Sequence, residues 1–337
     1  MRTPPDMAAW QGRIDDAEGD LGRRWHQAVK PLAAESEGIA FLGFACDAGV
    51  ARNHGRTGAS AGPAAIRAML CNMPLRNRAG LFDAGDVRCR PLAAGDDGLE
   101  QAQEALASCL DGLLERGLFP VVLGGGHEMA YGSFSGLARQ LARTQAVEGK
   151  PAPRIGIINL DAHFDLRMAD RGSSGTPFRQ IAEDCTARGW PFHYCCLGVS
   201  EFANTEALFA RARSLGVVWR RDVDMGAAQY GQTLYELATF MAGMDHLYLT
   251  VCLDVLPASV APGVSAPAAR GVALELIESI VEAVARSGRL RLADIAEMNP
   301  GLDIDQHTAR VAARLVAGIV ECVSSPADAI ASRNDGP

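Results

Sequence analysis

The chain has 337 residues, of which 48% are hydrophobic, and a formal net charge of −8 at pH 7. This length can bury a large core, and the acidic balance argues against nucleic acid or an anionic membrane surface as the main partner. No stretch approaches the roughly 20 apolar residues of a membrane span, and residues 1–6 lack the apolar core of a signal peptide. The nine cysteines include no C-x-x-C pair. We therefore expect a cytoplasmic protein with reduced cysteines.

Strand-like and helix-like segments alternate along most of the chain. The expected strands are residues 39–44, 81–86, 119–123, 155–160, 193–198, 217–219, 247–253 and 290–297. The expected helices are residues 62–70, 99–116, 128–146, 178–188, 204–214, 228–243, 273–287 and 305–323, with a surface helix near 13–29. This alternation predicts an α/β fold with a mostly parallel sheet of about eight strands between helices. We expect a lead-in at 1–38, one domain at 39–325 and a tail at 326–337.

The segment Ile155-Gly-Ile-Ile-Asn-Leu160 runs directly into Asp161-Ala-His-Phe-Asp165. The first part is typical of a strand buried on both faces, and the second places two carboxylates and an imidazole where that strand stops. Burying such groups costs several kcal/mol unless a cation or a hydrogen-bond network satisfies them. By itself, however, a D-x-H-x-D loop is as often a solvated turn.

Two other expected strands end in the same kind of group. The strand expected at 119–123 is followed by Gly124-Gly-Gly126 and His127. The strand expected at 247–253 runs into the segment Cys252-Leu-Asp254. Sites in open α/β sheets form at the carboxyl ends of strands, so these groups can share one pocket. The sequence therefore predicts a two-metal hydrolytic centre with the ligands His127, Asp161, His163, Asp165, Cys252 and Asp254.

These motifs, together with Ala293-Asp-Ile-Ala-Glu-Met-Asn-Pro300, resemble the arginase/agmatinase/formimidoylglutamase (ureohydrolase) family over about 39–325. The segments 49–56, 174–178, 198–205 and 256–267 resemble the formimidoylglutamase branch. The resemblance implies a three-layer α/β/α sandwich, a homo-oligomer and two Mn²⁺ ions per subunit. It also implies hydrolysis of a small carboxylated amidine, N-formimidoyl-L-glutamate, to L-glutamate and formamide in histidine breakdown.

Carried over residue by residue, the resemblance implies that His127 and Asp165 bind one Mn²⁺ and that His163 and Asp254 bind the other, with Asp161 between them. Cys252 stands where arginases carry a second bridging Asp. A thiolate is softer than the oxygen ligands that Mn²⁺ prefers, so Cys252 as a ligand and Cys252 as a bystander both stay open.

The catalytic and substrate-binding residues form a second set of expectations. Asp254 is expected to relay a proton to the leaving nitrogen, and Glu297 to pair with the cationic amidinium. Glu297 considered alone would more often be a buried structural carboxylate. The substrate carboxylates need cations or N–H donors. For these we expect Asn53, Arg56, Ser174, Gly175, Thr176 and Arg270.

Two alternatives remain open at this point. Within the same chemistry, the substrate could be arginine, agmatine or another guanidino compound. Against this, Ser174-Gly-Thr176 stands in the loop where arginases and agmatinases commonly place a His. From another class, the chain could be a non-catalytic relative that binds a ligand and whose metal site Cys252 has impaired.

Overall fold

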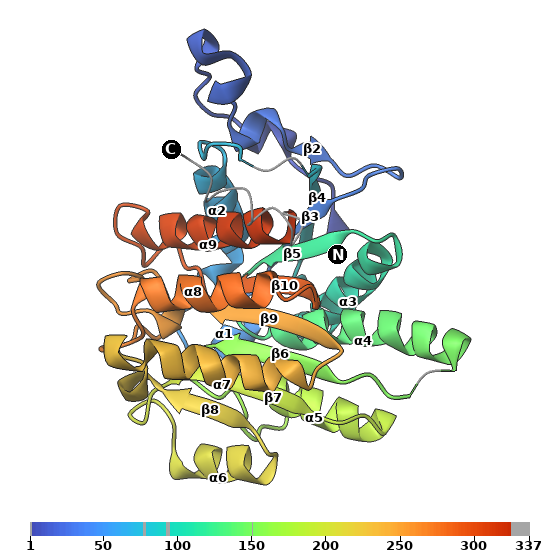
Figure 1. Cartoon of the computed structure of the whole chain (residues 1–337), viewed down its shortest axis with the longest axis vertical. Coiled ribbons are helices and arrows are strands. Elements are labelled where there is room, and N and C mark those ends of the chain that lie inside the picture. Colours follow the sequence, from blue (N-terminus) through green and yellow to red (C-terminus); the bar gives the residue numbers. More distant parts are fainter. Residues whose placement is uncertain (1, 77–78, 92–94, 150, 325–337) are drawn as a thin grey trace, which may run out of the picture.

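The computed structural model describes residues 2–76, 79–91, 95–149 and 151–324 (Figure 1). The expected tail at 326–337 lies outside these residues. Within them, the strands form one ten-stranded sheet in the order β1-β4-β3-β5-β10-β9-β6-β7-β8, with β2 also pairing with β4. The strands are β1 Arg2–Thr3, β2 Lys30–Pro31, β3 Ile39–Ala45, β4 Leu81–Arg88, β5 Phe119–Leu123, β6 Ile155–Leu160, β7 His193–Val199, β8 Val218–Arg221, β9 His246–Cys252 and β10 Leu290–Ala296.

Helices cover both faces of this sheet (Figure 1). They are α1 Ala48–Arg52, α2 Gly62–Leu70, α3 Leu99–Glu115, α4 Met129–Glu148, α5 Pro177–Arg188, α6 Glu206–Ser214, α7 Tyr230–Ala242, α8 Leu274–Ala285 and α9 His307–Ser324. One core packs α2, α7, α8 and α9 against one face, and the other packs α3, α4, α5 and α6 against the opposite face. Alternate residues of β3 supply both cores, with Phe41 in the first and Ala40 and Leu42 in the second, as the period-two strand geometry requires.

The expected α/β sandwich is confirmed, and its sheet has ten strands where about eight were expected. The two additional strands, β1 and β2, are two residues long and lie in the N-terminal segment, and β1 pairs antiparallel with β4. Strands this short show no alternation of apolar and polar residues, so their sequence could not reveal them.

The helix expected near 13–29 is also wrong. That segment forms short 3₁₀ turns at Asp16–Gly22 and Trp25–Gln27, and Gly19 interrupts the first with φ 56° and ψ −140°. The segment is nevertheless packed on the sheet, because the centre of the Trp25 ring lies 5.5 Å from the centre of the Phe41 ring in β3. No helix in the described residues is both long enough and apolar enough to cross a membrane.

Candidate metal centre and active site

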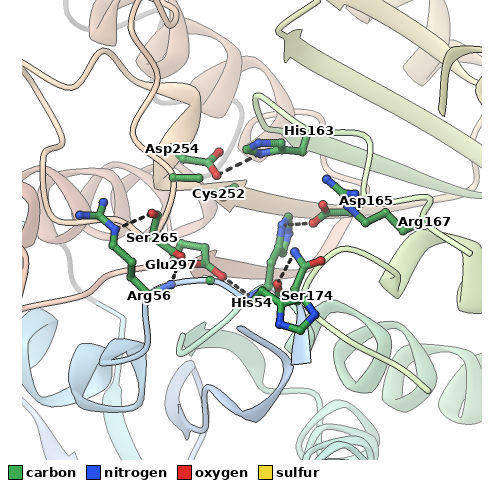
Figure 2. Close-up of a pocket in the computed structure, with 14 residues that line it drawn as sticks. His54, Arg56, His163, Asp165, Arg167, Ser174, Cys252, Asp254, Ser265 and Glu297 are labelled. Carbon is green, nitrogen blue, oxygen red and sulfur yellow. Dashed lines mark hydrogen bonds and ion pairs between the residues drawn. The ribbon is translucent and has the colours of Figure 1, made fainter. Parts of the chain in front are cut away.

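The expected ligand and catalytic side chains lie at the carboxyl ends of four neighbouring strands, β5, β10, β9 and β6. His127 follows β5, Glu297 follows β10, Cys252 ends β9 and Asp161 follows β6. These strands run parallel, so their carboxyl ends share one edge of the sheet. That edge holds a cavity of about 380 Å³ (Figure 2), and its lining includes His127, His163, Asp165, Cys252, Asp254 and Glu297.

Asp161 lies between the two histidines and behind the cavity wall, where it is fully buried. Its Oδ2 is 2.9 Å from His127 Nδ1, and its Oδ1 is 3.4 Å from His163 Nδ1. His127 Nδ1 also lies 3.0 Å from Asp165 Oδ2, and His163 Nδ1 lies 3.2 Å from Asp254 Oδ2. The structure therefore brings together two imidazole–carboxylate pairs that share the carboxylate of Asp161.

These side chains fit divalent cations. His127 Nδ1 is buried and makes no well-directed hydrogen bond, although two carboxylates lie within 3.0 Å of it. The ligand atoms of Asp161, His163 and Asp254 all lie within 4.8 Å of one another, as do those of His127, Asp161 and Cys252. Carboxylate oxygens are donors that Mn²⁺ prefers, and imidazole nitrogens are common ligands of divalent transition metals.

The pKa values of the carboxyl groups show how costly the unneutralised cluster is. Burial and the charge of Asp161 raise the pKa of Asp165 to about 6. Burial and the charge of Asp254 raise the pKa of Glu297 to about 8. Burial opposes protonation of His127, but Asp161 and Asp165 together hold its pKa well above the ordinary value. A cation bound among these groups would replace the protons that now balance their charges.

Cys252 stands in the cluster rather than beside it. Its side chain is buried and lines the cavity, next to Asp254 in the close-up of Figure 2. Burial raises the pKa of its thiol well above the usual value, and the charges of Asp161, Asp254 and Glu297 raise it further. The thiol therefore stays protonated unless a cation stabilises the thiolate. This placement is compatible with a ligand role, which remains a prediction.

The backbone is strained at two of the site carboxylates. Asp165 has φ 48° and Glu297 has φ 70°, a left-handed conformation that side chains other than glycine seldom adopt. Such strain persists only where the surrounding structure enforces it, and it is concentrated at functional sites. In Glu297, Oε1 accepts a hydrogen bond from the backbone N–H of His127 at 3.0 Å, whereas the buried Oε2 has no hydrogen-bond partner among the described residues.

A second layer of buried groups orients the ligands. Thr250 Oγ1 lies 3.0 Å from His127 Nε2. Burial raises the pKa of Asp294, and the nearby Thr250 hydroxyl opposes that rise. Asp294 accepts a hydrogen bond from Tyr248 at 2.6 Å. A Thr250 hydroxyl that is turned toward the Asp294 carboxylate accepts from His127 Nε2, and this tautomer leaves the Nδ1 lone pair for a metal. Sequence reasoning missed this network, because Thr250 and Asp294 are ordinary residues within strands.

The expected substrate-binding residues divide into two groups. Asn53, Arg56 and Ser174 line the cavity, and Asn53 Nδ2 donates to Ser174 Oγ at 3.2 Å. The other three do not line it. They are Gly175, Thr176, which is buried and bonded within its own loop, and Arg270, which lines a neighbouring cavity of about 490 Å³.

The cavity has further lining residues that sequence reasoning missed or took for loop residues: His54, Gly55, Arg167, Ser265 and Ala266. The only sequence signal for Arg167 was its position two residues after Asp165. Ser265 and Ala266 come from a loop about 210 residues further along the chain than His54, so only the folded structure brings them together.

A family model for the arginase family matches residues 37–321. The chain therefore belongs to the arginase family, as its motifs predicted.

Its curated relatives are more specific. The formimidoylglutamase of Ralstonia nicotianae is 62% identical over 327 residues, covering 96% of this chain and 98% of that protein. The formimidoylglutamase of Aromatoleum aromaticum is 52% identical over 315 residues, covering 92% of this chain and 91% of that protein.

Solved structures agree on the fold. The formimidoylglutamase of Bacillus subtilis matches with a TM-score of 0.78 at 22% identity, over 93% of this chain and 94% of its own. A structure of Trypanosoma cruzi formiminoglutamase with Mn²⁺ matches with a TM-score of 0.76 at 26% identity, over 90% of this chain and 99% of its own.

Proposed function

We propose that this protein is a metal-dependent amidine hydrolase that converts N-formimidoyl-L-glutamate and water to L-glutamate and formamide in histidine degradation. The observation that carries the proposal is the meeting of His127, Asp161, His163, Asp165 and Asp254 at one sheet edge, beside a buried Glu297 oxygen that lacks a partner. The 62% identity to a formimidoylglutamase over nearly the whole chain supports the choice of substrate.

Two Mn²⁺ ions would be held by His127 and Asp165 on one side and by His163 and Asp254 on the other, with Asp161 between them. When bound, such ions supply an acidified water and stabilise negative charge that develops in the reaction. The Mn²⁺ in the T. cruzi relative supports the choice of metal. The number of ions and the part of Cys252 in holding them are proposals.

The protein side chains have two tasks in the reaction. Glu297 Oε2 accepts a hydrogen bond from the cationic amidinium and holds the formimidoyl carbon in place for attack by water. The tetrahedral intermediate then loses its C–N bond to glutamate. Asp254 takes the proton of the attacking water and delivers it to the leaving nitrogen, because its carboxylate is within reach of both. Formamide and glutamate are released.

Substrate binding completes the proposal. Asn53, Arg56 and Ser174 lie in the cavity and remain candidates for polar contacts with the substrate. Arg270 shares its neighbouring cavity with His163, so we place it near the distal end of the substrate. For Gly175 and Thr176, which do not line the cavity, we propose that they act by shaping the loop that carries Ser174. We further propose that the protein is cytoplasmic and forms a homo-oligomer. Light scattering of the purified protein would test the oligomeric state.

The nearest alternative is hydrolysis of arginine, agmatine or another guanidino compound. The experiment that separates the two assays the Mn²⁺-loaded protein for formamide release from N-formimidoyl-L-glutamate and for urea release from arginine and agmatine. We expect formamide and no urea. Urea from arginine without formamide would overturn the proposal.

A non-catalytic role is the alternative from another class, and only the presence of Cys252 favours it. Metal analysis of the purified protein distinguishes the two. A hydrolase retains close to two Mn²⁺ per chain. A chain that binds none and shows no turnover after Mn²⁺ is added would instead be a ligand-binding relative.

A further inference from the structure

Arg167 brings a guanidinium to the cavity wall beside the ligand cluster. Its side chain lines the cavity two residues after Asp165, and Figure 2 shows the two side chains together, on the side opposite Arg56. The backbone of Arg167 is held at both ends: its N–H donates to Gly175 O at 2.9 Å, and its carbonyl accepts from Arg179 Nε at 2.8 Å. The position of this side chain is therefore set by the loop rather than by a partner for its charge.

The loop also leaves room for the side chain of Arg167. A Cβ added at Gly175 would lie 2.8 Å from Arg167 Cδ and 3.1 Å from Nε, so the arginine packs across a glycine. No hydrogen bond or ion pair joins its guanidinium to another residue in the described part of the chain. A guanidinium offers five N–H donors, and those of Arg167 are free for a ligand.

The other arginines near the site either already donate hydrogen bonds within the protein or lie farther from the ligand cluster. Arg56 donates from Nε to Ser265 O at 2.9 Å and from its Nη2 to Val264 O at 2.8 Å, so it holds the 264–265 segment in place. Arg270 lies in the neighbouring cavity, where Asp222 faces it. Of the arginines that line the cavity, Arg167 is the one whose donors are not already used within the described structure.

The proposed substrate needs a cation at this particular place. In N-formimidoyl-L-glutamate the leaving nitrogen is bonded to the α-carbon, which also carries the α-carboxylate. When the formimidoyl carbon lies at the ligand cluster, that carboxylate must lie against the adjoining wall. The cavity also contains Asp165, Asp254 and Glu297, which would repel it without a cation between. Arginine, by contrast, carries its carboxylate at the far end of a three-carbon chain.

We infer that Arg167 binds the α-carboxylate of the substrate through paired N–H donors and so selects amidines whose leaving nitrogen is attached to an α-amino acid. This inference rests on the proposed function. It makes Arg167 the residue that distinguishes a formimidoyl amino acid from a guanidino compound, whose carboxylate lies elsewhere or is missing.

The test compares Arg167→Met and Arg167→Lys with the parent, using full-length Mn²⁺-loaded protein and three probes. The first is N-formimidoyl-L-glutamate. The second, N-formimidoyl-L-norvaline, keeps the α-carboxylate and lacks the distal one. The third, N-formimidoyl-4-aminobutanoate, keeps the distal carboxylate and lacks the α-carboxylate. Formamide release and bound Mn²⁺ are measured for each protein.

For Arg167→Met we expect kcat/KM to fall roughly 10- to 100-fold with the two α-carboxylated probes, the size of a lost hydrogen bond to a charged group. We expect no change with the aminobutanoate probe and unchanged Mn²⁺ content. Lys should restore part of the loss, because it keeps the charge without the fork of donors. The matched control is Arg171→Met in the same loop, whose guanidinium bonds Glu100 at 3.1 Å, and it should behave as the parent.

Three results would overturn the inference while leaving the proposed function intact: equal losses on all three probes, no loss on any, or a loss confined to probes with the distal carboxylate. A parent protein that releases no formamide from any probe would instead refute the proposed function, and the inference with it.

Discussion

At the scale of single residues, Cys252 is the site's main departure from an all-oxygen and imidazole ligand set. Its sulfur shares a ligand cluster with His127 and Asp161. A soft sulfur ligand binds Mn²⁺ less well than a carboxylate does, and the same position could favour a softer metal. The metal preference of the protein therefore depends on whether this thiol is ionised when metal is bound.

We expect Cys252→Ala to bind about one Mn²⁺ fewer per chain and to lose most of its activity, and Cys252→Asp to regain the metal, because a carboxylate oxygen suits Mn²⁺. Metal content and rate would be measured with Mn²⁺, Zn²⁺ and Fe²⁺. Cys195→Ala is the control, since Cys195 is buried in the core. If both Cys252 variants match the parent, the thiol is a bystander.

A second prediction concerns the groups behind His127. Asp294→Asn can present an N–H to Thr250 and reverse the hydrogen bonds that direct the Nδ1 lone pair of His127 to the metal. We expect about a 10- to 100-fold loss of Mn²⁺ affinity, measured by titration calorimetry. Thr250→Val should lose a similar amount, and the double variant no more than either alone, since the two residues act in one network.

The control for this pair is Thr233→Val, which removes a buried hydroxyl of α7 that bonds Gln229 O just before that helix, away from the site. If the losses of Mn²⁺ affinity in Asp294→Asn and Thr250→Val add fully in the double variant, the two residues do not act in a shared network.

At the scale of elements, the turn between β5 and α4 positions His127. Gly126 N donates to Cys46 O at 2.9 Å, and a Cβ at Gly125 would lie 1.9 Å from that same oxygen. The glycines therefore allow the turn to pass close to the end of β3. The three glycines are visible in the sequence, but the reason for them is the backbone of another strand.

Gly125→Ala should force this turn away from β3, costing about 1–3 kcal/mol of unfolding free energy and weakening Mn²⁺ binding, because His127 moves with it. Chemical denaturation and metal titration measure the two effects. The paired control is Gly112→Ala in α3, where an added Cβ meets nothing within 4 Å, so a gain of about 0.4–1 kcal/mol is expected. A Gly125→Ala protein as stable as the parent would show that the turn can relax.

At the scale of the whole molecule, four neighbouring strands end in groups that repel one another until a cation or protons balance them. A carboxyl such as Asp165, whose pKa is about 6 when folded and roughly 4 when unfolded, stabilises the fold below pH 4. That contribution is lost as the pH rises through 6. Metal binding requires the same proton to leave, as well as those on His127 and His163, whose pKa values are also raised.

We therefore expect the increase in Tm caused by saturating Mn²⁺ to grow between pH 5 and pH 8. Differential scanning fluorimetry of the metal-free and Mn²⁺-loaded protein would measure it. In Asp165→Asn, the part of this Tm increase that follows the titration of Asp165 near pH 6 should disappear. An increment that is constant across this range would mean that protons and Mn²⁺ do not compete for the site.

Much of this architecture can be predicted from the sequence. Continuous apolar runs such as 155–160, each ending in a carboxylate, imidazole or thiol, predict a parallel sheet with chemistry at one edge, because both follow from local periodicity and strand polarity. The arginase family membership is confirmed for the same reason: its motifs are short, local and ordered along the chain. The number of strands was not predictable, since two-residue strands depend on their partners.

The sequence by itself determined which residues are candidates for the chemistry, because ligand type and spacing are properties of the chain. Only the tertiary structure decided what surrounds them. Asp294 lies behind His127, and the guanidinium of Arg56 donates a hydrogen bond to Ser265 O. The guanidinium of Arg167 lines the cavity without such a partner among the described residues. Contacts of this kind join residues far apart in the chain, and they depend on strand order and loop packing, which no local pattern encodes.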